Sequence, residues 1–566
     1  MPATRIAKRT VGIKLLDQLV REGLHPVMAA IYAGRGIRSR AELDDALAAL
    51  LPPEPLIGAQ RAAVLLADSI EAGRRLMIVA DYDCDGATAC ALGVRALRSF
   101  GAQVDFVVPD RFRFGYGLTP EIVALAAERG AQLLITVDNG IASVEGVDAA
   151  NRLGIAVVIT DHHLPGAELP RAAAIVNPNQ PGCGFPSKNL AGVGVMFYVM
   201  GALRAELRRR GAFAGRNAPN LADLLDLVAL GTVADVVRLD QNNRVLVAQG
   251  LKRIRAGRMQ PGVRALFAVA GREPSRATGF DLGFMLGPRL NAAGRLDDMS
   301  VGIECLITDD TSRALTLARS LDDLNRARRS IETQMQERAE VLLSGITVTA
   351  SSSLSLFDPG WHQGVVGILA GRVKDRFHRP VIAFARGNPG ELRGSGRSIS
   401  GVHLRDALDL VAKRAPGMLI RFGGHAAAAG LTIREPDFEG FSALFEDVIG
   451  ALASPAELER VIETDGSLAP AYLNLDLARL IESQIWGQGF PQPLFLDEFA
   501  VANQRVVGER HLKLRLERAG RVIEAMRFQS LDPLPAQVRA AYRLSVNEYN
   551  GAQSLQLVIE HWEAVA

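Results

Sequence analysis

Cysteine is scarce in this chain of 566 residues, and the few cysteines form no pattern. There is no Cys-x-x-Cys pair and no even ladder of spacings, which argues against a zinc site and against a disulfide framework. We expect all of the thiols to be reduced. The cysteines are Cys84, Cys90, Cys183 and Cys305.

A long apolar run and a strong net charge are also missing. We find no apolar stretch of about 18 residues and no signal core after MPATRIAKRTVG, so we expect a cytoplasmic protein with no membrane contact. The 64 basic and 62 acidic residues leave a formal net charge of +2, so a polyanion site requires local clustering of charge. Only seven basic residues are lysines; arginine suits phosphate contacts, but a GC-rich genome produces the same bias.

The chain has ample material for a globular core. Hydrophobic residues make up 48% of it and charged residues 22%, a composition typical of globular proteins. Because 566 residues exceed what one core usually organises, we expect three or four domains.

An acidic cluster interrupts the apolar run MIVADYDCDG at residues 77–86. Asp81, Asp83 and Asp85 would repel one another, so close packing requires a compensating cation, unless the cluster is only a polar turn. A helix-loop-helix calcium site needs Glu at loop position 12, where Leu92 stands. An aspartyl-phosphatase motif, Asp-x-Asp-x-Thr/Val, fails because its fifth residue is Asp85.

Strands and helices alternate after this cluster, which predicts a mostly parallel, doubly wound α/β sheet. QVDFVVP, LLITVDNG and IAVVITDHH are strand-like, and SVEGVDAANRLG is helix-like. Another predicted helix starts with Thr119 as cap, Pro120 at the first position and Glu121 in the first turn.

Acidic residues lie where three apolar strands end, MIVA before the cluster and the strands in LLITVDNG and IAVVITDHH after it. Asp81, Asp138 and the run Asp161-His162-His163 all follow apolar strands, and ligands of such sheets bind at the carboxyl ends of the strands. GTVADVV adds Asp235 in a short apolar context. We therefore predict a binuclear metal site.

The ligand types indicate which ions and which chemistry to expect. Carboxylates with imidazole suit Mn²⁺ or Mg²⁺, and we expect Cys84 to point away from the ions. Two such ions can activate water and neutralise charge on a phosphorus-bound oxygen, which is the chemistry of phosphoester hydrolysis.

These motifs resemble those of a known group. DYDCDG, VDNG, DHH and TVADV, in this order, are similar to the four motifs of the DHH phosphoesterase superfamily. Four later motifs resemble its RecJ branch, bacterial 5′-to-3′ single-stranded-DNA exonucleases with a DHH-associated domain. They are GPRLNAAGR (287–295), GWHQGVVGILAGRV (360–373), GSGRS (394–398) and GGHAAAAG (423–430).

The resemblance implies a ligand set for two ions. Asp81, Asp83 and Asp138 would hold one ion, and Asp138 would bridge to the other. His163 would contact the substrate phosphate and assist proton transfer, or act only as a structural imidazole, and Asp161 would orient its neighbours. The second ion would be held by Asp85, Asp138, His162 and Asp235.

Further residues are candidates for binding the substrate. RFRFGYG (111–117) alternates arginines with aromatics, which suits phosphate contact and base stacking, although a strand edge or turn would read the same way. Glycine-rich loops at 394–398 and 423–430 would let backbone amides approach a phosphate and form the second wall of a cleft. The candidates are Arg111, Tyr116, Arg289, Asn291, Arg295, Ser395, Arg397, Gly424 and His425.

The rest of the chain predicts a long helix and a β domain. Residues 311–343 lack Gly and Pro and have leucines at helical spacing, and Arg326, Arg328 and Arg329 form a basic face that either tracks phosphates or is simply solvated. From about 455 onward, short alternating strands and an Asn550-Gly551 turn predict a small barrel, which the resemblance identifies as OB-like. We predict these segments: 1–44 N-terminal, 45–310 catalytic, 311–345 connecting helix, 346–452 DHH-associated and 453–566 barrel.

The resulting hypothesis is a Mn²⁺- or Mg²⁺-dependent exonuclease that removes nucleotides from the 5′ end of single-stranded DNA in repair and recombination. We expect a monomer, and the resemblance adds a single-strand-binding protein and a helicase as partners. Two rivals are a DHH-type phosphodiesterase of short oligonucleotides or small phosphate compounds, and a non-enzymatic DNA-binding relative. The second rival should have lost metal acids, and this chain has not.

Overall fold

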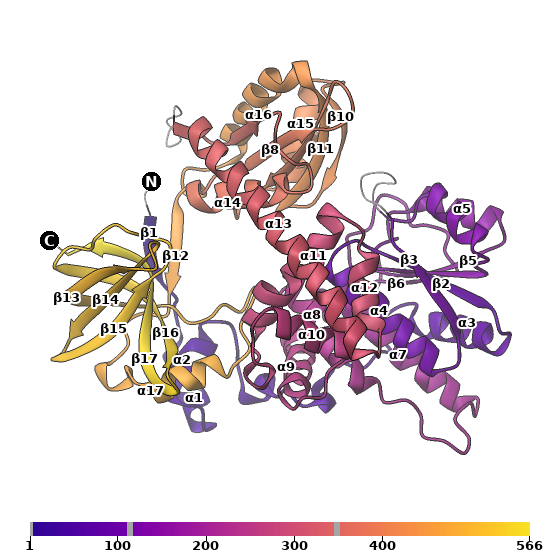
Figure 1. Cartoon of the computed structure of the whole chain (residues 1–566), viewed down its shortest axis with the longest axis horizontal. Helices are drawn as coiled ribbons and strands as arrows, with labels where there is room; N and C mark the ends of the chain where they lie inside the picture. Colours follow the sequence, from indigo (N-terminus) through magenta and orange to yellow (C-terminus); the bar gives the residue numbers. More distant parts are fainter. Residues whose placement is uncertain (1–3, 110–116, 345–350, 566) are drawn as a thin grey trace. The chain divides into compact units, whose positions relative to one another are not determined.

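The computed structural model describes residues 4–109, 117–344 and 351–565. Contacts divide the chain into two compact units, one of Met1–Lys8 with Asn325–Glu463 and the other of Arg9–Leu324 with Thr464–Ala566 (Figure 1). Among the described residues, no helix is both long enough and apolar enough to cross a membrane.

A five-stranded parallel sheet organises the first part of the larger unit, as the strand-helix alternation predicts. Its strands are hydrogen-bonded in the order β3-β2-β4-β5-β6, and every pair is parallel. The strands are β2 (Arg75–Ala80), β3 (Gln103–Val107), β4 (Leu133–Val137), β5 (Ala156–Thr160) and β6 (Ala174–Val176).

Both faces of this sheet are covered, which explains the continuous apolar runs of its strands. Successive residues of β2 point to opposite sides: Ile78 joins one hydrophobic cluster and Val79 another. Thr119 caps a helix as predicted, its hydroxyl accepting from the Ile122 amide at 3.4 Å. One face carries α3 (Ala59–Glu71), α4 (Cys84–Ser99) and α7 (Gly192–Arg209), and the other carries α5 (Pro120–Glu128) and α6 (Val144–Arg152).

A helical region follows the sheet and ends in the predicted long helix, α13 (Thr311–Ser344). The prediction of one basic face on α13 is wrong for Arg328. Its side chain is buried and donates to Glu332 at 2.6 Å and to Asn325 at 3.0 Å. The preceding elements are α8 (Leu225–Ala234), α9 (Gln241–Arg255), α10 (Pro261–Val269), a π-helix (Asp281–Leu286), α11 (Gly287–Leu296) and α12 (Ser300–Ile307).

The smaller unit is built on a mixed sheet of the order β10-β11-β9-β8-β7, in which only the β7–β8 pair is parallel. A short strand, β1 (Thr4–Lys8), pairs with β12 (Arg460–Thr464). The sheet strands are β7 (Leu354–Phe357), β8 (Val381–Arg386), β9 (Glu391–Arg397), β10 (Leu419–Gly424) and β11 (Ala428–Arg434). The helices are α14 (Val366–Phe377), α15 (Leu404–Arg414) and α16 (Phe438–Leu452).

The glycine-rich motifs of this unit are not the loops that we predicted. GSGR lies inside β9, and most of GGHAAAAG lies in β10 and β11, so their backbone groups pair within the sheet. A Cβ on Gly394 would lie 2.6 Å from the Phe384 ring, and one on Gly396 would lie 2.7 Å from Leu404. These glycines therefore make room for core side chains, a demand that the motif alone does not reveal.

The C-terminal strands form a closed barrel of the order β13-β14-β15-β17-β16, which confirms the predicted β domain. Asn550 (φ 50°) and Gly551 (φ 78°) make the predicted tight turn between β16 and β17. The domain boundaries remain predictions. The elements are α17 (Leu475–Glu482), β13 (Phe495–Val507), β14 (His511–Arg518), β15 (Arg521–Arg527), β16 (Gln537–Tyr549) and β17 (Ala552–Ala564).

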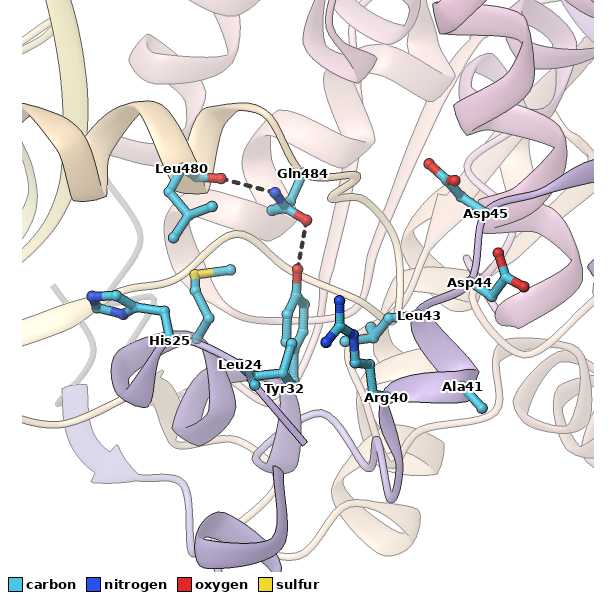
Figure 2. A pocket seen from close by; sticks show the side chains of 12 residues that line it. Leu24, His25, Tyr32, Arg40, Ala41, Leu43, Asp44, Asp45, Leu480 and Gln484 are labelled. Carbon is cyan, nitrogen blue, oxygen red and sulfur yellow. Dashed lines mark hydrogen bonds between the residues drawn. The ribbon is translucent and has the colours of Figure 1, made fainter. Parts of the chain in front are cut away.

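Two N-terminal helices, α1 (Ile13–Arg21) and α2 (Pro26–Ala33), belong to the same unit as the barrel. The Tyr32 hydroxyl donates to Gln484 Oε1 at 2.7 Å, just beyond α17 (Figure 2). Residues from the N-terminal region, together with Leu480 and Gln484, line a cavity of about 800 Å³. This hydrogen bond helps fix the segment that leads into the barrel.

Candidate metal centre

Three strands of the parallel sheet, β2, β4 and β5, are each followed directly by an aspartate. The amides of Asp81, Asp138 and Asp161 continue the ladder, donating to the carbonyl oxygens of the neighbouring strand ends at 3.3, 2.9 and 3.1 Å. The carboxyl ends of neighbouring parallel strands meet at one edge, so the sheet itself gathers these side chains.

The start of α4 contributes two more carboxylates. Asp83 caps the helix, with its Oδ1 accepting from the amides of Asp85 and Gly86 at 2.9 and 3.0 Å. Asp85 is fully buried, and its two oxygens accept from the first amides of α7, at Gly192 (2.5 Å) and Val193 (2.9 Å). The amino-terminal end of α7 thus stabilises a buried negative charge.

Asp138 stands in a tight backbone position. Its φ is 61°, in the left-handed region that non-glycine residues rarely adopt. A Cβ on Gly192 would lie 2.7 Å from the Asp138 Cβ, so the start of α7 approaches this aspartate as closely as glycine allows. The next residue, Asn139, holds the turn by donating to the carbonyls of Val79 and Val137. Strained backbone of this kind clusters at functional sites.

His162 lies among three carboxylates. Its Nε2 is 3.0 Å from Asp138 Oδ1, 3.5 Å from Asp235 Oδ2 and 3.9 Å from Asp85 Oδ2. Asp235 reaches this place as the residue directly after α8. Burial, followed by the neighbouring His163, lowers the pKa of His162 to about 4, so its imidazole is neutral and able to ligate a cation.

His163 has a different environment. Its Nδ1 lies 2.7 Å from Asp161 Oδ1, while Asp161 Oδ2 accepts from the Ile141 amide. Burial opposes the charged imidazole, but the hydrogen bond and charge of Asp161 outweigh it and raise the pKa of His163 to about 9. The side chain of His163 is 31% exposed, against 13% for His162, so His163 is the more accessible of the two.

The carboxylates of this edge are short of positive charge. Burial and the charge of Asp83 raise the pKa of Asp85 to about 7. Burial, together with the neighbouring aspartates, raises the pKa of Asp138 and of Asp235 well above the usual value. Carboxylates forced together in this way are stabilised by a bound cation.

The ligand atoms fall into groups that fit divalent ions. Within each group they lie within 4.8 Å of one another. The buried Nε2 of His162 makes no hydrogen bond to any described residue, although three carboxylates surround it, as expected of a ligand that faces a cation. Oxygen atoms with one or two imidazoles suit Mn²⁺ or Mg²⁺. The groups are Asp81, Asp83 and Asp138; Asp85, His162 and Asp235; and Asp138, His162 and His163.

The thiol of Cys84 belongs to the hydrophobic core and to none of these groups. The motif at 287–295 lies beside them, on α11. Asn291 Oδ1 accepts from the Cys84 amide at 2.7 Å and so braces the start of α4. Arg289 is buried and donates to Asp322 at 2.9 Å, and Arg295 is half-buried. The substrate contacts proposed for these α11 residues remain predictions.

The remaining candidates gather at one end of the mixed sheet. Gly424 pairs with Ala429, which pairs with Gly396, so the β10–β11 turn adjoins Ser395 and Arg397. Arg397 Nη1 lies 3.3 Å from Ser395 Oγ, and His425 is exposed at the turn. Their roles remain predictions. Arg111 and Tyr116 lie outside the described residues.

Sequence reasoning missed the residues that support the histidines. Asn177 follows β6 as the aspartates follow the other strands, and its side-chain amide donates to the His163 carbonyl at 2.9 Å. Asn179 donates to the His162 carbonyl at 2.6 Å. The stretch AIVNPN, an apolar strand ending in a polar residue, carried the same signal as the acidic strand ends.

Comparisons with known proteins agree with this architecture. Residues 75–232 match the DHH family, N-terminal domain; residues 345–451 match the DHHA1 domain; and residues 464–561 match the RecJ OB domain. These matches cover the parallel sheet, the mixed sheet and the barrel.

Several relatives are similar over almost their whole length. The chain is 52% identical over 555 residues to the single-stranded-DNA-specific exonuclease RecJ of Dickeya dadantii and 50% identical over 552 residues to that of Escherichia coli, covering 95% of this chain and 96% of each relative. Among solved structures, RecJ from Thermus thermophilus in complex with Mn²⁺ matches with a TM-score of 0.85 and 30% identity, over 100% of this chain and 80% of that one. The Mg²⁺ complex from the same organism matches with a TM-score of 0.78 and 29% identity, over 100% of this chain and 79% of that one. The chain belongs to the RecJ family of single-stranded-DNA-specific exonucleases.

Proposed function

We propose that this chain hydrolyses the phosphodiester bonds of single-stranded DNA, one nucleotide at a time from the 5′ end, with two divalent ions at the acidic edge of the parallel sheet. One observation carries the proposal: aspartates whose pKa values are raised surround the neutral imidazole of His162. When bound, Mn²⁺ or Mg²⁺ would activate water and neutralise charge on the phosphate.

Two of the three ligand groups support a division of the residues between two ions. Asp81 and Asp83 would hold one ion, and Asp85, His162 and Asp235 would hold the other. Asp138 would bridge them, because it belongs to one group with Asp81 and Asp83 and its Oδ1 is 3.0 Å from His162.

His163 would act on the substrate. In the metal-free chain, Asp161 raises the pKa of His163 to about 9, which favours an imidazolium that would donate a hydrogen bond to a phosphate oxygen and a proton to the leaving oxygen. Asp161 holds the ring by its Nδ1 and compensates its charge. Asp161 is therefore a positioning residue.

The substrate class in this proposal comes from the relatives, and we add to it a cellular process and partners. The relatives' names specify single-stranded DNA. We place the reaction in cytoplasmic DNA repair and recombination, carried out by a monomer that works with a single-strand-binding protein and a helicase. Ser395, Arg397, Gly424 and His425 would contribute to holding the strand.

The test is digestion of single strands labelled at the 5′ end, at the 3′ end or not at all, with Mn²⁺ or with EDTA. The proposal expects immediate release of 5′-labelled mononucleotide, persistence of the 3′ label on shortening strands, resistance of the matched duplex, and no reaction in EDTA. Hydrolysis restricted to two- to four-nucleotide substrates would favour a small-substrate phosphodiesterase. Binding without hydrolysis would favour a DNA-binding relative.

A further inference from the structure

Two exposed phenylalanines stack on each other on an element that packs against the metal-binding segments. The rings of Phe280 and Phe284 have centroids 5.0 Å apart and planes at 22°, and the two residues are 58% and 65% exposed. Phe441 and Phe445 have the same spacing and also stack, but both are fully buried in a core. Stacking at this spacing is thus ordinary, and its exposure at Phe280 and Phe284 calls for an occupant.

The exposed pair sits on a firmly held element. Phe280 immediately precedes the π-helix and Phe284 lies within it, and π-helical turns occur frequently at functional sites. Asp281 is buried: its Oδ1 accepts from Arg272 at 2.6 Å and its Oδ2 from the amide and hydroxyl of Thr278 at 2.8 Å. The phenylalanines therefore project from fixed backbone.

This element is built against two of the metal-binding segments. A Cβ on Gly287 would lie 2.9 Å from Ala234, the neighbour of Asp235. The π-helix runs directly into α11, where a Cβ on Gly294 would overlap the carbonyl oxygen of Tyr82, the residue between Asp81 and Asp83. In Figure 1, α8 and α11 can be followed side by side.

The residues just before the π-helix lie against the segment that leads into the barrel. A Cβ on Gly279 would lie 3.4 Å from the Trp486 carbonyl oxygen, and the Leu239 amide, four residues after Asp235, donates to the Gln488 carbonyl at 2.8 Å. The phenylalanine pair thus belongs to an element shared by the acidic edge and the approach to the barrel.

We propose that Phe280 and Phe284 form a stacking platform for a base of the single strand, a few nucleotides from the bond that is cut. This inference rests on the proposed function and adds a base-binding position to it. An aromatic face accepts every base, so the platform adds affinity without sequence preference, and duplex DNA, whose bases are already stacked, gains nothing from it.

The test combines variants of the pair with strands that carry one abasic position, walked from the 5′ end. For the intact strand, F280A/F284A should raise KM by about 10- to 100-fold, the scale of one or two lost base stacks, with kcat within about twofold. For the wild type, one abasic position should raise KM about 10-fold, and the double variant should lose this dependence. F284W should retain it.

Two control variants separate stacking from simple apolar contact. F280L/F284L keeps two apolar side chains but loses both aromatic faces, so it should behave like F280A/F284A. L153A removes a side chain that is 56% exposed on the same unit and should change nothing. An unchanged KM in the double variant, or an abasic dependence that survives in it, would overturn the platform.

Binding of the same strands in EDTA gives a readout that does not depend on hydrolysis. Wild-type binding weakened by one abasic position, and insensitive to it in the double variant, supports the platform even if the strand is not cut. Hydrolysis that proceeds normally in the double variant, with unchanged binding, rejects the platform and leaves the proposed function standing.

Discussion

The two sheets of this protein use motif residues in opposite ways. At one edge of the parallel sheet, acids that follow strands meet acids from the ends of two helices, and burial, followed by the charge of neighbouring aspartates, raises the pKa values of Asp85, Asp138 and Asp235. In the mixed sheet, Gly394 and Gly396 lie within a strand and make room for neighbouring side chains. Crowded like charges indicate chemistry because folding alone disfavours them, whereas a glycine in a motif can serve packing alone.

Among substitutions in the two sheets, loss of the bridging acid Asp138 should lower activity the most. Asp138→Asn should lower the hydrolysis rate more than about 100-fold, because it removes a charge that both ions would share, while phosphate contacts elsewhere preserve most DNA binding. The matched control is Asp105→Asn, an exposed aspartate on β3 of the same sheet. A variant at Asp138 that keeps more than about a tenth of the wild-type rate in saturating metal would remove the bridge from the account.

Mn²⁺ should stabilise the protein increasingly as pH rises. The folded-state pKa values of Asp85, Asp138 and Asp235 are raised, so in the metal-free protein these acids favour folding at low pH and lose that contribution as pH rises through about 7, the value for Asp85. Bound metal requires the ionised acids and reverses this dependence. At about a hundredfold excess over Kd, stabilisation should reach about 2.7 kcal/mol.

The measurement is the difference in Tm between Mn²⁺ and EDTA at each pH from about 5.5 to about 8, which cancels the titration of all distant groups. A difference that is flat with pH, or that falls as pH rises, would contradict the electrostatic account of the acidic edge.

The packing role of the glycines can be tested on the mixed sheet. Gly396→Ala should lower the free energy of unfolding by about 1–3 kcal/mol, because the new Cβ would lie 2.7 Å from Leu404. Gly430→Ala on the neighbouring strand is the control, since its Cβ would meet nothing closer than 4.0 Å. Equal stability of the two variants in denaturant titration would show that Gly396 serves something other than packing.

The smallest expected effect concerns the arginine of the same motif. Arg397→Lys keeps the charge but loses the planar fork that suits a terminal phosphate, so the preference for 5′-phosphorylated over unphosphorylated strands should fall several-fold. The ratio of the two rates is the quantity to measure, with Arg393→Lys on the same strand as control. An unchanged ratio would assign Arg397 to structure.

The sequence predicted the parts of the molecule that depend on local patterns. Apolar strands ending in acids located Asp81, Asp138 and Asp161, and the absence of Gly and Pro located α13. The prediction that these acids lie together is confirmed, because strand order in a parallel sheet brings successive carboxyl ends to one edge, whereas the two ions that they would hold remain a prediction.

Other features depend on residues distant in sequence or on the surroundings that the fold creates, and could not be predicted in the same way. The sequence predicted that Arg328 belongs to a basic face, whereas in the fold its side chain is buried and donates hydrogen bonds to Asn325 and Glu332. The amides of Gly192 and Val193 donate to Asp85, which lies more than 100 residues earlier in the sequence. The exposure of Phe280 and Phe284 depends on which other segments pack around them, and the local sequence does not contain that information.

Anomalous diffraction at the manganese edge, from crystals grown with Mn²⁺, would locate the metal ions directly. We expect two peaks at the edge of the parallel sheet, one among Asp81, Asp83 and Asp138, and one among Asp85, His162 and Asp235, with Asp138 in contact with both ions. No peak at this edge, or peaks only elsewhere on the molecule, would contradict the proposed two-ion site.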